Sequence, residues 1–501
     1  MSRINTNVQS QLAQRILTNQ NKSLNQSLER LSTGLRINRG ADDPAGLIAS
    51  ENLRAEKASI SAAIGNAERA DQVVNIAEGG LQEINGLLLE VQSLVGQSAN
   101  DAGLSQEERD ANQLQVDSIL QTIDRIASAT SFQGTKLLNG TFDFTVSAQA
   151  SQVLDFQVNA SKLKFGENRS VEVLVTQSAQ QAGFLLSLGA TTLDLSSTNN
   201  SFTFEVAGAD GSREFTFSSG VALSSIRTAV NTFSDVTGVS AIVSGTGLVF
   251  KSDEYGSDKF VSIAFSSDGD TDFGIYALSA TDESAADPSA FTALSTITGF
   301  NSFRDAGQDV GAVVNGIAAT SKGRVARIGT DFLDVEFELN AAGATTLGTI
   351  NAFTITGGGA KFNLGPNVDI TNQVSVGIGN VAARNLGTIS NGFLDDLGSS
   401  KAANVVDGDL GKAQKVVNDA INQVASLRGR LGAFQKNIVG ATIRSLGVAL
   451  ENTSAAESSI RDTDFASETA ALTRSQILVN AATNTLSIAN SQPQSVLGLL
   501  G

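Results

Sequence analysis

Residues 53–95 read LRAEKASISAAIGNAERADQVVNIAEGGLQEINGLLLEVQSLV, and this stretch decides the fold. An apolar residue recurs in it every seven positions, at Leu53, Ile60, Ala67, Val74, Leu81, Leu88 and Val95. A second series, made of Ala63, Ala70, Ala77, Ile84 and Val91, follows three residues after members of the first. This spacing is typical of a helix that packs along one apolar stripe, as in a coiled coil. An isolated helix is marginal in water, so the stripe requires partner helices.

The far end of the chain carries a matching stripe. Its members are Leu410, Ala413, Val417, Ala420, Val424, Leu427, Leu431, Phe434, Ile438 and Ala441. We therefore predict that both ends of the chain share one helical rod. The residues expected in its core are Leu53, Ile60, Val74, Leu81, Leu88, Val417, Val424, Leu431 and Ile438. Asp43 followed by Pro44 is typical of a helix start and predicts a new helix there.

The middle of the chain has a different composition. Residues 141–400 hold 22 of the 25 phenylalanines, and 27 Asp/Glu against 13 Lys/Arg. Apolar and polar residues alternate in runs such as 202–206 and 334–339, between clusters rich in Gly, Asp and Ser, which predicts strands. The expected fold class is a multidomain α+β protein, with paired terminal helices and a strand-rich insert that forms outer domains.

These patterns divide the chain into three parts. Residues 1–43 and 462–501 form the innermost helical part, and residues 44–165 and 400–461 form the main helical rod. Residues 166–399 form the strand-rich part, in which 195–265 suggests a β-β-α-β-β unit and 266–399 a further β domain.

Composition excludes several kinds of chemistry. The 501 residues include no His and no Cys, so a His general base, a thiolate nucleophile and a Cys/His zinc site are all excluded. The formal net charge of −17 disfavours binding to nucleic acid or to anionic lipid. No stretch approaches the about 20 apolar residues that a membrane span needs, and the N-terminus lacks a secretory signal peptide. We expect no cofactor and no enzymatic activity.

Two short motifs resemble binding sites only by their letters. The run 268–272 places three Asp at the odd positions of a calcium loop, but Phe273 and Ser279 stand where an EF-hand needs Gly and Glu. The run 377–382 matches a loose dinucleotide fingerprint without a βαβ unit around it. We interpret both as turns. A glycosidase-like carboxylate pair in the acidic middle stays open at this point.

The outermost segments have narrow apolar stripes and little else to bury. Such a pair buries too little surface to be stable alone, so its order has to come from neighbouring chains. The predicted contacts for subunit assembly are Leu17, Leu24, Leu28, Leu31, Leu35, Phe465, Leu472, Val479 and Leu486.

Several stretches together resemble bacterial flagellin, the subunit of the flagellar filament. The resemblance covers roughly residues 1–145 and 400–501. It is carried by INTN at 4–7, LSTGLRIN at 31–38, ADDPAG at 41–46, FQGTKLL at 132–138, LGAFQ at 431–435, DTDFA at 462–466 and QPQSVL at 492–497. The unit near 195–265 is similar to an insert that recurs in flagellins and hook-associated proteins.

The resemblance implies a secreted, extracellular protein of the bacterial flagellum that polymerises into a helical filament for swimming motility. It implies export of the unfolded chain through the flagellar type III system, and an export chaperone that holds the C-terminal segment. Hook-associated junction proteins and a cap protein would be further partners. Open-ended growth is what heterologous contacts produce when they do not close a ring.

One segment departs from the family pattern. Flagellins that the innate immune flagellin receptor senses carry arginines on the helix that here includes Leu89, Glu90, Gln92 and Leu94. Glu90 and Gln92 replace those arginines, while Leu94 is retained. Replacing a cation by a carboxylate reverses the local charge, so the resemblance implies weak receptor recognition here.

Two alternative functions fit the same sequence. A hook–filament junction protein shares the terminal patterns and would differ in its abundance in the flagellum. A filament protein whose outer domains also bind a surface or a glycan would show this binding in the isolated residues 166–399.

Overall fold

The computed structural model describes residues 6–164, 166–195, 201–265, 273–278, 286–293 and 302–497. They group into two compact units. The terminal unit comprises Met1–Gln72, Asn363–Asn372 and Ala433–Gly501, and the central unit comprises Val73–Phe362 and Gln373–Gly432. Helices at both ends and sheets in the middle confirm the predicted α+β class.

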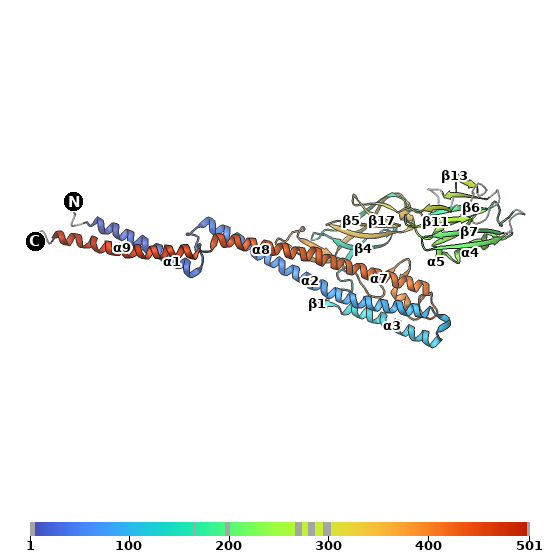
Figure 1. The fold of residues 1–501 in the computed structure, drawn as a ribbon, viewed down its shortest axis with the longest axis horizontal. Coiled ribbons are helices and arrows are strands. Elements are labelled where there is room, and N and C mark those ends of the chain that lie inside the picture. The colour runs from blue at the N-terminus through green and yellow to red at the C-terminus, as the bar shows by residue number, and fades with distance from the viewer. Residues whose placement is uncertain are drawn as a thin grey trace. The chain divides into compact units, whose positions relative to one another are not determined.

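The terminal unit is helical. It contains α1 (Val8–Thr33), the first part of α2 (Pro44–Ser98), the π-helical turn η4 (Phe434–Val439), α8 (Gly440–Arg461) and α9 (Phe465–Leu497). Helices α1 and α9 lie side by side (Figure 1). As predicted, α2 begins at Pro44, and the Asp43 side chain accepts a hydrogen bond from the Gly46 amide at 2.9 Å.

A short bend joins α1 to α2 and is tied to the connection between α8 and α9. Gly34 ends α1 with φ of 74°, a left-handed conformation that glycine adopts without strain. Its carbonyl accepts from the Thr463 amide at 2.9 Å, and the Arg36 amide donates to the Arg461 carbonyl at 2.7 Å. Ile37 is buried beneath this bend. The two bends therefore hold each other in place.

The helices of the central unit bury the part of the predicted stripe that falls within them, such as Val74, Leu81 and Val424. They are the second part of α2, the 3-10 turn η1 (Asp101–Gly103), α3 (Gln106–Ala129) and α7 (Leu410–Ala433). Ser105 and Glu108 form a capping box at the start of α3. Arg428 of α7 pairs with Glu78 of α2 at 2.8 Å, and Gln92 of α2 donates to Asn418 of α7 at 2.8 Å.

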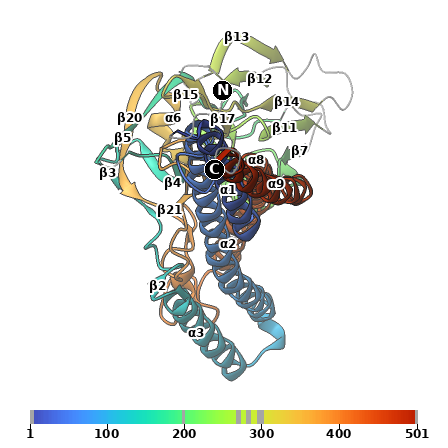
Figure 2. The same ribbon diagram turned by 90° about the vertical axis from the view of Figure 1, so that its left-hand side faces the viewer.

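The remaining central unit holds two β-domains, which we call the host and the inserted β-domain. The host β-domain has two antiparallel sheets, in the orders β16-β15-β5-β20-β3 and β17-β18-β19-β4. Figure 2 shows β3, β5 and β20 side by side. Both sheets contribute to one buried core, which includes Val173 of β5 and Phe337 of β19. The strands and helix are β3 (Phe144–Ser147), β4 (Val153–Ser161), β5 (Arg169–Gln177), β15 (Gly311–Val314), β16 (Ile317–Ala318), β17 (Thr320–Lys322), β18 (Val325–Gly329), β19 (Leu333–Leu339), α6 (Ala341–Thr345) and β20 (Gly348–Gly358).

The inserted β-domain has a separate, phenylalanine-rich core. Its sheets run β13-β12-β6-β10-β9 and β14-β11-β7-β8. Phe202, Phe204 and Phe250 are fully buried between them, and α4 packs against β9. The elements are β6 (Gly183–Ser187), β7 (Ser201–Gly208), β8 (Ser212–Ser218), α4 (Leu223–Asn231), α5 (Ser234–Thr237), β9 (Val239–Ser244), β10 (Gly247–Ser252), β11 (Phe260–Phe265), β12 (Gly274–Leu278), β13 (Ala286–Ala293) and β14 (Ser302–Ala306).

Short elements connect these parts. They are β1 (Ser131–Phe132), β2 (Thr135–Lys136), β21 (Ala360–Asn363), β22 (Gln373–Val376), β23 (Gly387–Thr388), β24 (Gly392–Phe393) and the 3-10 turn η3 (Leu394–Leu397).

The β-domains do not follow the sequence boundaries that we expected. Strands β3 and β4 precede residue 166, and β4 pairs with β19 along its length. The host β-domain therefore takes strands from both sides of the inserted β-domain. Segment 195–265 is also not self-contained, because β6 and β12 complete one of its sheets.

One predicted core position is displaced by the turn η4. Ile438 is 39% exposed, whereas Phe434 and Val439 are buried. A spacing of four from Phe434 would bury Ile438, but a π-helical turn widens the spacing to five residues and buries Val439 instead. Ile438 therefore lies on the exposed side of the helix and not in the rod core that the spacing predicts.

We expect Val439→Asp to destabilise the helices far more than Ile438→Asp. A carboxylate at Val439 is buried without a partner and should lower the free energy of unfolding by about 3 kcal/mol, against about 1 kcal/mol at Ile438, where it reaches water. The measurement is the urea midpoint of helix unfolding, followed by far-ultraviolet circular dichroism. Equal midpoints for the two variants would contradict the displaced register.

Candidate assembly surface

Helices α1 and α9 pack along a seam of small residues. Ser10, Ala13 and Ser27 are buried on α1, and Ser475, Ala482 and Ala489 are buried on α9. On α9 they alternate at spacings of three and four with the larger, half-buried Leu472, Val479 and Leu486. On α1 the half-buried Leu17, Leu24 and Leu31 lie on the same stripe as the small residues, without strict alternation. The spacing is that of a coiled-coil seam, with small and large residues interleaved.

Polar contacts flank this seam. Near the start of α1, the Ser10 hydroxyl lies 2.6 Å from Oδ1 of Asn490, and the Asn7 side chain donates to the Ala489 carbonyl at 2.7 Å. At the other end Arg30 lies 3.6 Å from Glu468. A partly exposed ion pair of this kind contributes about 1 kcal/mol at most. The polar contacts therefore set the register of the two helices more than they stabilise the pair.

The predicted assembly contacts fall into two groups. Six of them, Leu17, Leu24, Leu31, Leu472, Val479 and Leu486, lie on the α1–α9 seam, where they are half-buried within one chain. Leu35 is half-buried in the bend, where it pairs with Asp462. Leu28 and Phe465 are 47% and 58% exposed. The structure thus gives the six an intramolecular partner, and their contact with another chain stays a prediction.

Other apolar residues of these helices remain open to solvent. On α1, Val8, Leu12 and Ile16 are exposed at a spacing of four and so share one face, beside the buried seam. On α9, Ile477 and Ile488 are 62% and 64% exposed. Sequence reasoning missed these residues because it followed only the seven-residue stripes. An apolar face of this kind on a helix pair is typical of a surface that binds another protein.

Helix α8 also leaves apolar side chains exposed to solvent. None of its residues is buried, and Val448 is 58% exposed. Two ion pairs connect the C-terminal part of α8 to α2. Glu457 pairs with Lys57 and Arg461 pairs with Glu51, each at 3.2 Å. The apolar side chains of α8 are at most half-buried within the chain, so much of its surface is open to a partner.

The predicted core of the rod is buried, with two exceptions. Leu53 is half-buried, and Ile438 is displaced as described above. The fully buried members are Ile60, Val74, Leu81, Leu88, Val417, Val424 and Leu431.

The segment that departs from the receptor-sensed family pattern is only partly accessible. Leu89 is 50% exposed and Glu90 is exposed. Leu94 is buried, and the Gln92 amide is engaged by Asn418.

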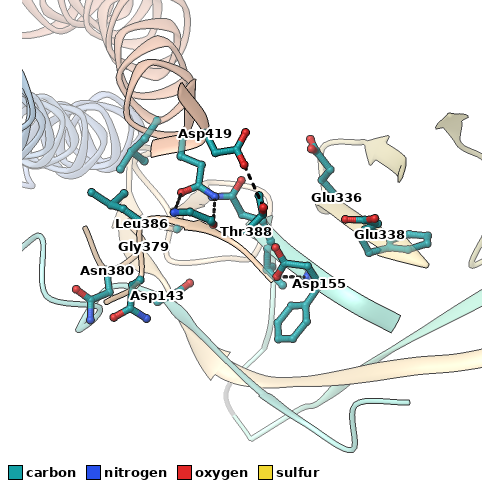
Figure 3. Close-up of a pocket in the computed structure, with 18 of the residues that line it drawn as sticks. Asp143, Asp155, Glu336, Glu338, Gly379, Asn380, Leu386, Thr388 and Asp419 are labelled. Atoms are coloured by element: carbon teal, nitrogen blue, oxygen red, sulfur yellow. Dashed lines mark hydrogen bonds between the residues drawn. The ribbon is translucent and has the colours of Figure 1, made fainter. Parts of the chain in front are cut away.

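An acidic cleft of about 690 Å³ lies between α7 and the host β-domain (Figure 3). Asp155 of β4 and Glu338 of β19 are direct cross-strand partners in its wall. Burial raises the pKa of Asp155, and burial also raises the pKa of Glu338 despite the attraction of Arg324. On the opposite side Asp419 accepts hydrogen bonds from Thr388 and Asn391, at 3.1 and 2.7 Å. These bonds anchor a loop to α7, and we interpret the cleft as part of that packing.

No metal or dinucleotide site emerges from the described residues. Among them, no three His, Cys, Asp or Glu side chains are grouped so that they could hold a metal ion. The acidic run 268–272 lies outside the described residues. The run 377–382 follows β22 as a loop and opens no helix, in line with a turn. Within the same described parts of the chain, no helix combines the length and apolarity of a membrane span.

Comparisons with known proteins cover the whole chain. A family model described as the bacterial flagellin N-terminal helical region matches residues 4–143, and one described as the C-terminal helical region matches residues 414–500. A flagellin of Salmonella rubislaw is 29% identical over 516 residues, and polar flagellin A of Vibrio parahaemolyticus is 28% identical over 499, each covering 99% of both chains. The crystal structure of hook-associated protein-3 from Legionella pneumophila aligns at 12% identity and a TM-score of 0.28, over 81% of this chain and 97% of that one. So low a score carries no argument about fold.

We expect Ala482→Asp to separate α1 from α9, because a carboxylate in the seam loses water without gaining a partner, at a cost of about 2 kcal/mol. Hydrogen exchange of the α1 amides in the full-length monomer should then accelerate at least about tenfold. Ala481→Asp is the matched control, because it adds the same charge one position away on the exposed side of α9. Equal exchange rates of the α1 amides in the two variants would contradict packing of α1 against Ala482.

Proposed function

Because both terminal regions of the chain belong to the bacterial flagellin family, we propose that this structural, extracellular filament subunit of the bacterial flagellum polymerises through the exposed apolar faces of α1, α8 and α9. One observation carries the proposal. These helices expose Ile16, Val448 and Ile477, while the seam that they do bury is lined by small residues. Copies of the same chain are the partners that would cover such faces in a homopolymer.

The geometry of growth follows from which faces are open. The α1–α9 seam is already occupied within the chain, so a neighbouring copy has to meet a different face from the one buried there. Contacts between two different patches repeat without limit when rotation does not close a ring. In this proposal residues 1–43 and 462–501 form the inner part of the filament, residues 44–165 and 400–461 surround it, and the strand-rich 166–399 face outward.

We further propose that the filament serves swimming motility and that the chain is exported unfolded by the flagellar type III system. An export chaperone would shield the apolar side chains of α9, such as Ile477 and Ile488, before export. Junction and cap proteins of the flagellum would meet the same open faces at the two ends of the polymer. Their chemistry has to match the apolar stripes that the copies themselves present.

Recognition by the innate flagellin receptor should be weak. Glu90 presents a carboxylate where sensed family members have an arginine, and Leu94 is buried in the chain. The engaged Gln92 amide offers little to a further partner.

We expect Ile477→Asp to leave the monomer folded and to abolish polymerisation. The side chain is 62% exposed in the monomer, so a carboxylate there stays hydrated until a neighbouring chain would bury it. Electron microscopy and sedimentation after salt-induced assembly measure the polymer, and circular dichroism measures the fold. Gln476→Glu adds the same charge to the exposed surface of α9 but about 100° around the helix from Ile477, and should still assemble. Filaments of normal length from Ile477→Asp would overturn the proposed interface.

Removing residues 492–501 should also stop polymerisation while leaving the β-domains intact. The deletion takes the end of α9 but no strand of either sheet core. Calorimetry would follow the unfolding of the β-domains, and sedimentation would follow polymer formation. Normal filaments from the shortened chain would contradict an assembly role for this end.

A further inference from the structure

The inserted β-domain is connected to the host β-domain by two linker segments, here called crossings, that lie next to each other. Gln180 leads from β5 into the inserted β-domain, and Gln308 leads back to β15. The two residues exchange both backbone hydrogen bonds, each at 2.9 Å. The Gln308 side chain also donates to the Ser178 carbonyl at 2.8 Å. The crossings therefore behave as a short two-stranded ribbon.

One carboxylate at this ribbon binds a loop from each β-domain. Oδ1 of Asp309 accepts from the Gly323 amide at 2.7 Å and from the Ser257 amide at 3.0 Å, and Oδ2 accepts from the Ser257 hydroxyl at 2.6 Å. Ser257 belongs to the loop between β10 and β11 of the inserted β-domain. Gly323 belongs to the turn between β17 and β18 of the host β-domain.

The two loops touch closely around this carboxylate. Gly256 has φ of 124°, and a Cβ there would lie 2.9 Å from the Gly323 Cα and 3.0 Å from Oδ1 of Asp309. Only glycine fits such an approach. The neighbouring Tyr255 packs against the core of the host β-domain, and the Arg324 guanidinium lies 5.5 Å from the centre of its ring. Apolar contact and polar bonds thus meet at one point.

Charged groups also act at the contact between these two loops, which we call the joint. Burial of Asp309 opposes its ionisation, but the hydrogen bonds from Ser257 and Gly323 outweigh it and lower the pKa of this carboxyl. Asp258 and Lys322 form a second link between the same loops at 3.0 Å. That ion pair is largely exposed and contributes little.

From this geometry we infer that Asp309 is a positioning residue that locks the inserted β-domain rigidly onto the host β-domain. Domains joined through short linkers and a small interface move relative to each other by default. Here the carboxylate satisfies three donors at the point where both crossings meet, so rotation of the inserted β-domain has to break charge-assisted hydrogen bonds.

The test compares Asp309→Ala with Asp258→Ala in the full-length monomer. Both variants remove one carboxylate from the joint. Since the chain has no cysteine, spin labels can be attached to cysteines introduced at the exposed Ser225 and Thr349, one in each β-domain. Double electron–electron resonance spectroscopy then gives the distribution of distances between the two labels, and so between the domains. We expect one narrow distribution for the parent and for Asp258→Ala, and a broad one for Asp309→Ala.

Hydrogen exchange supplies a second readout that does not depend on labels. Amides of Ser257 and Gly323 should exchange at least about tenfold faster in Asp309→Ala, while amides of the two β cores stay protected. Ser257→Ala keeps the carboxylate and should give an intermediate effect, which covers the case in which Asp309→Ala does not fold. An unchanged distance distribution in Asp309→Ala, or in Ser257→Ala if the former does not fold, would overturn the inference. Neither measurement depends on polymerisation.

Discussion

The structure depends on one constraint: helices with a periodic apolar stripe must find a cover for it, and a single chain can supply only part of that cover. In the central unit the constraint is satisfied, because α2, α3 and α7 bury a continuous row that includes Leu81, Leu88 and Val424. In the terminal unit it is satisfied only in part: Ile60 and Ala67 of α2 are buried, but no residue of α8 is fully buried, and α1 and α9 bury only a narrow seam. The difference leaves more apolar surface open on the terminal helices than on the helices of the central unit.

Much of the helical fold could be predicted from sequence, because its signals are local. Seven-residue spacing identified the rod core, and Asp43-Pro44 identified the start of α2. The failures also have local causes. A π-helical turn leaves no mark in the apolar pattern, so Ile438 was chosen where Val439 is buried. Small polar residues such as Ser10 and Ser27 carry no hydrophobic signal of their own, although they line the seam.

The β-domains were harder to predict because their pairing is non-local. Alternation indicates a strand, but it does not say that β4 pairs with β19 across the whole inserted β-domain. Nothing in the sequence around Asp309 distinguishes it from the many other acidic residues in the middle of the chain. Its role depends on three donors that come together only when both β-domains are folded. The candidate assembly surface was predicted at the level of helices and, among the exposed side chains, for Leu28 and Phe465 but not for Ile16, Val448 or Ile477.

The neighbouring positions of Gln180 and Gln308 have a consequence for how this chain can vary. A domain whose entry and exit points lie side by side can be exchanged or removed without separating the strands that receive it. The inserted β-domain can therefore be replaced as a unit, because both of its connections to the host β-domain lie at one place. The paired connections at Gln180 and Gln308 are also a suitable position for inserting a foreign protein whose two ends lie close together.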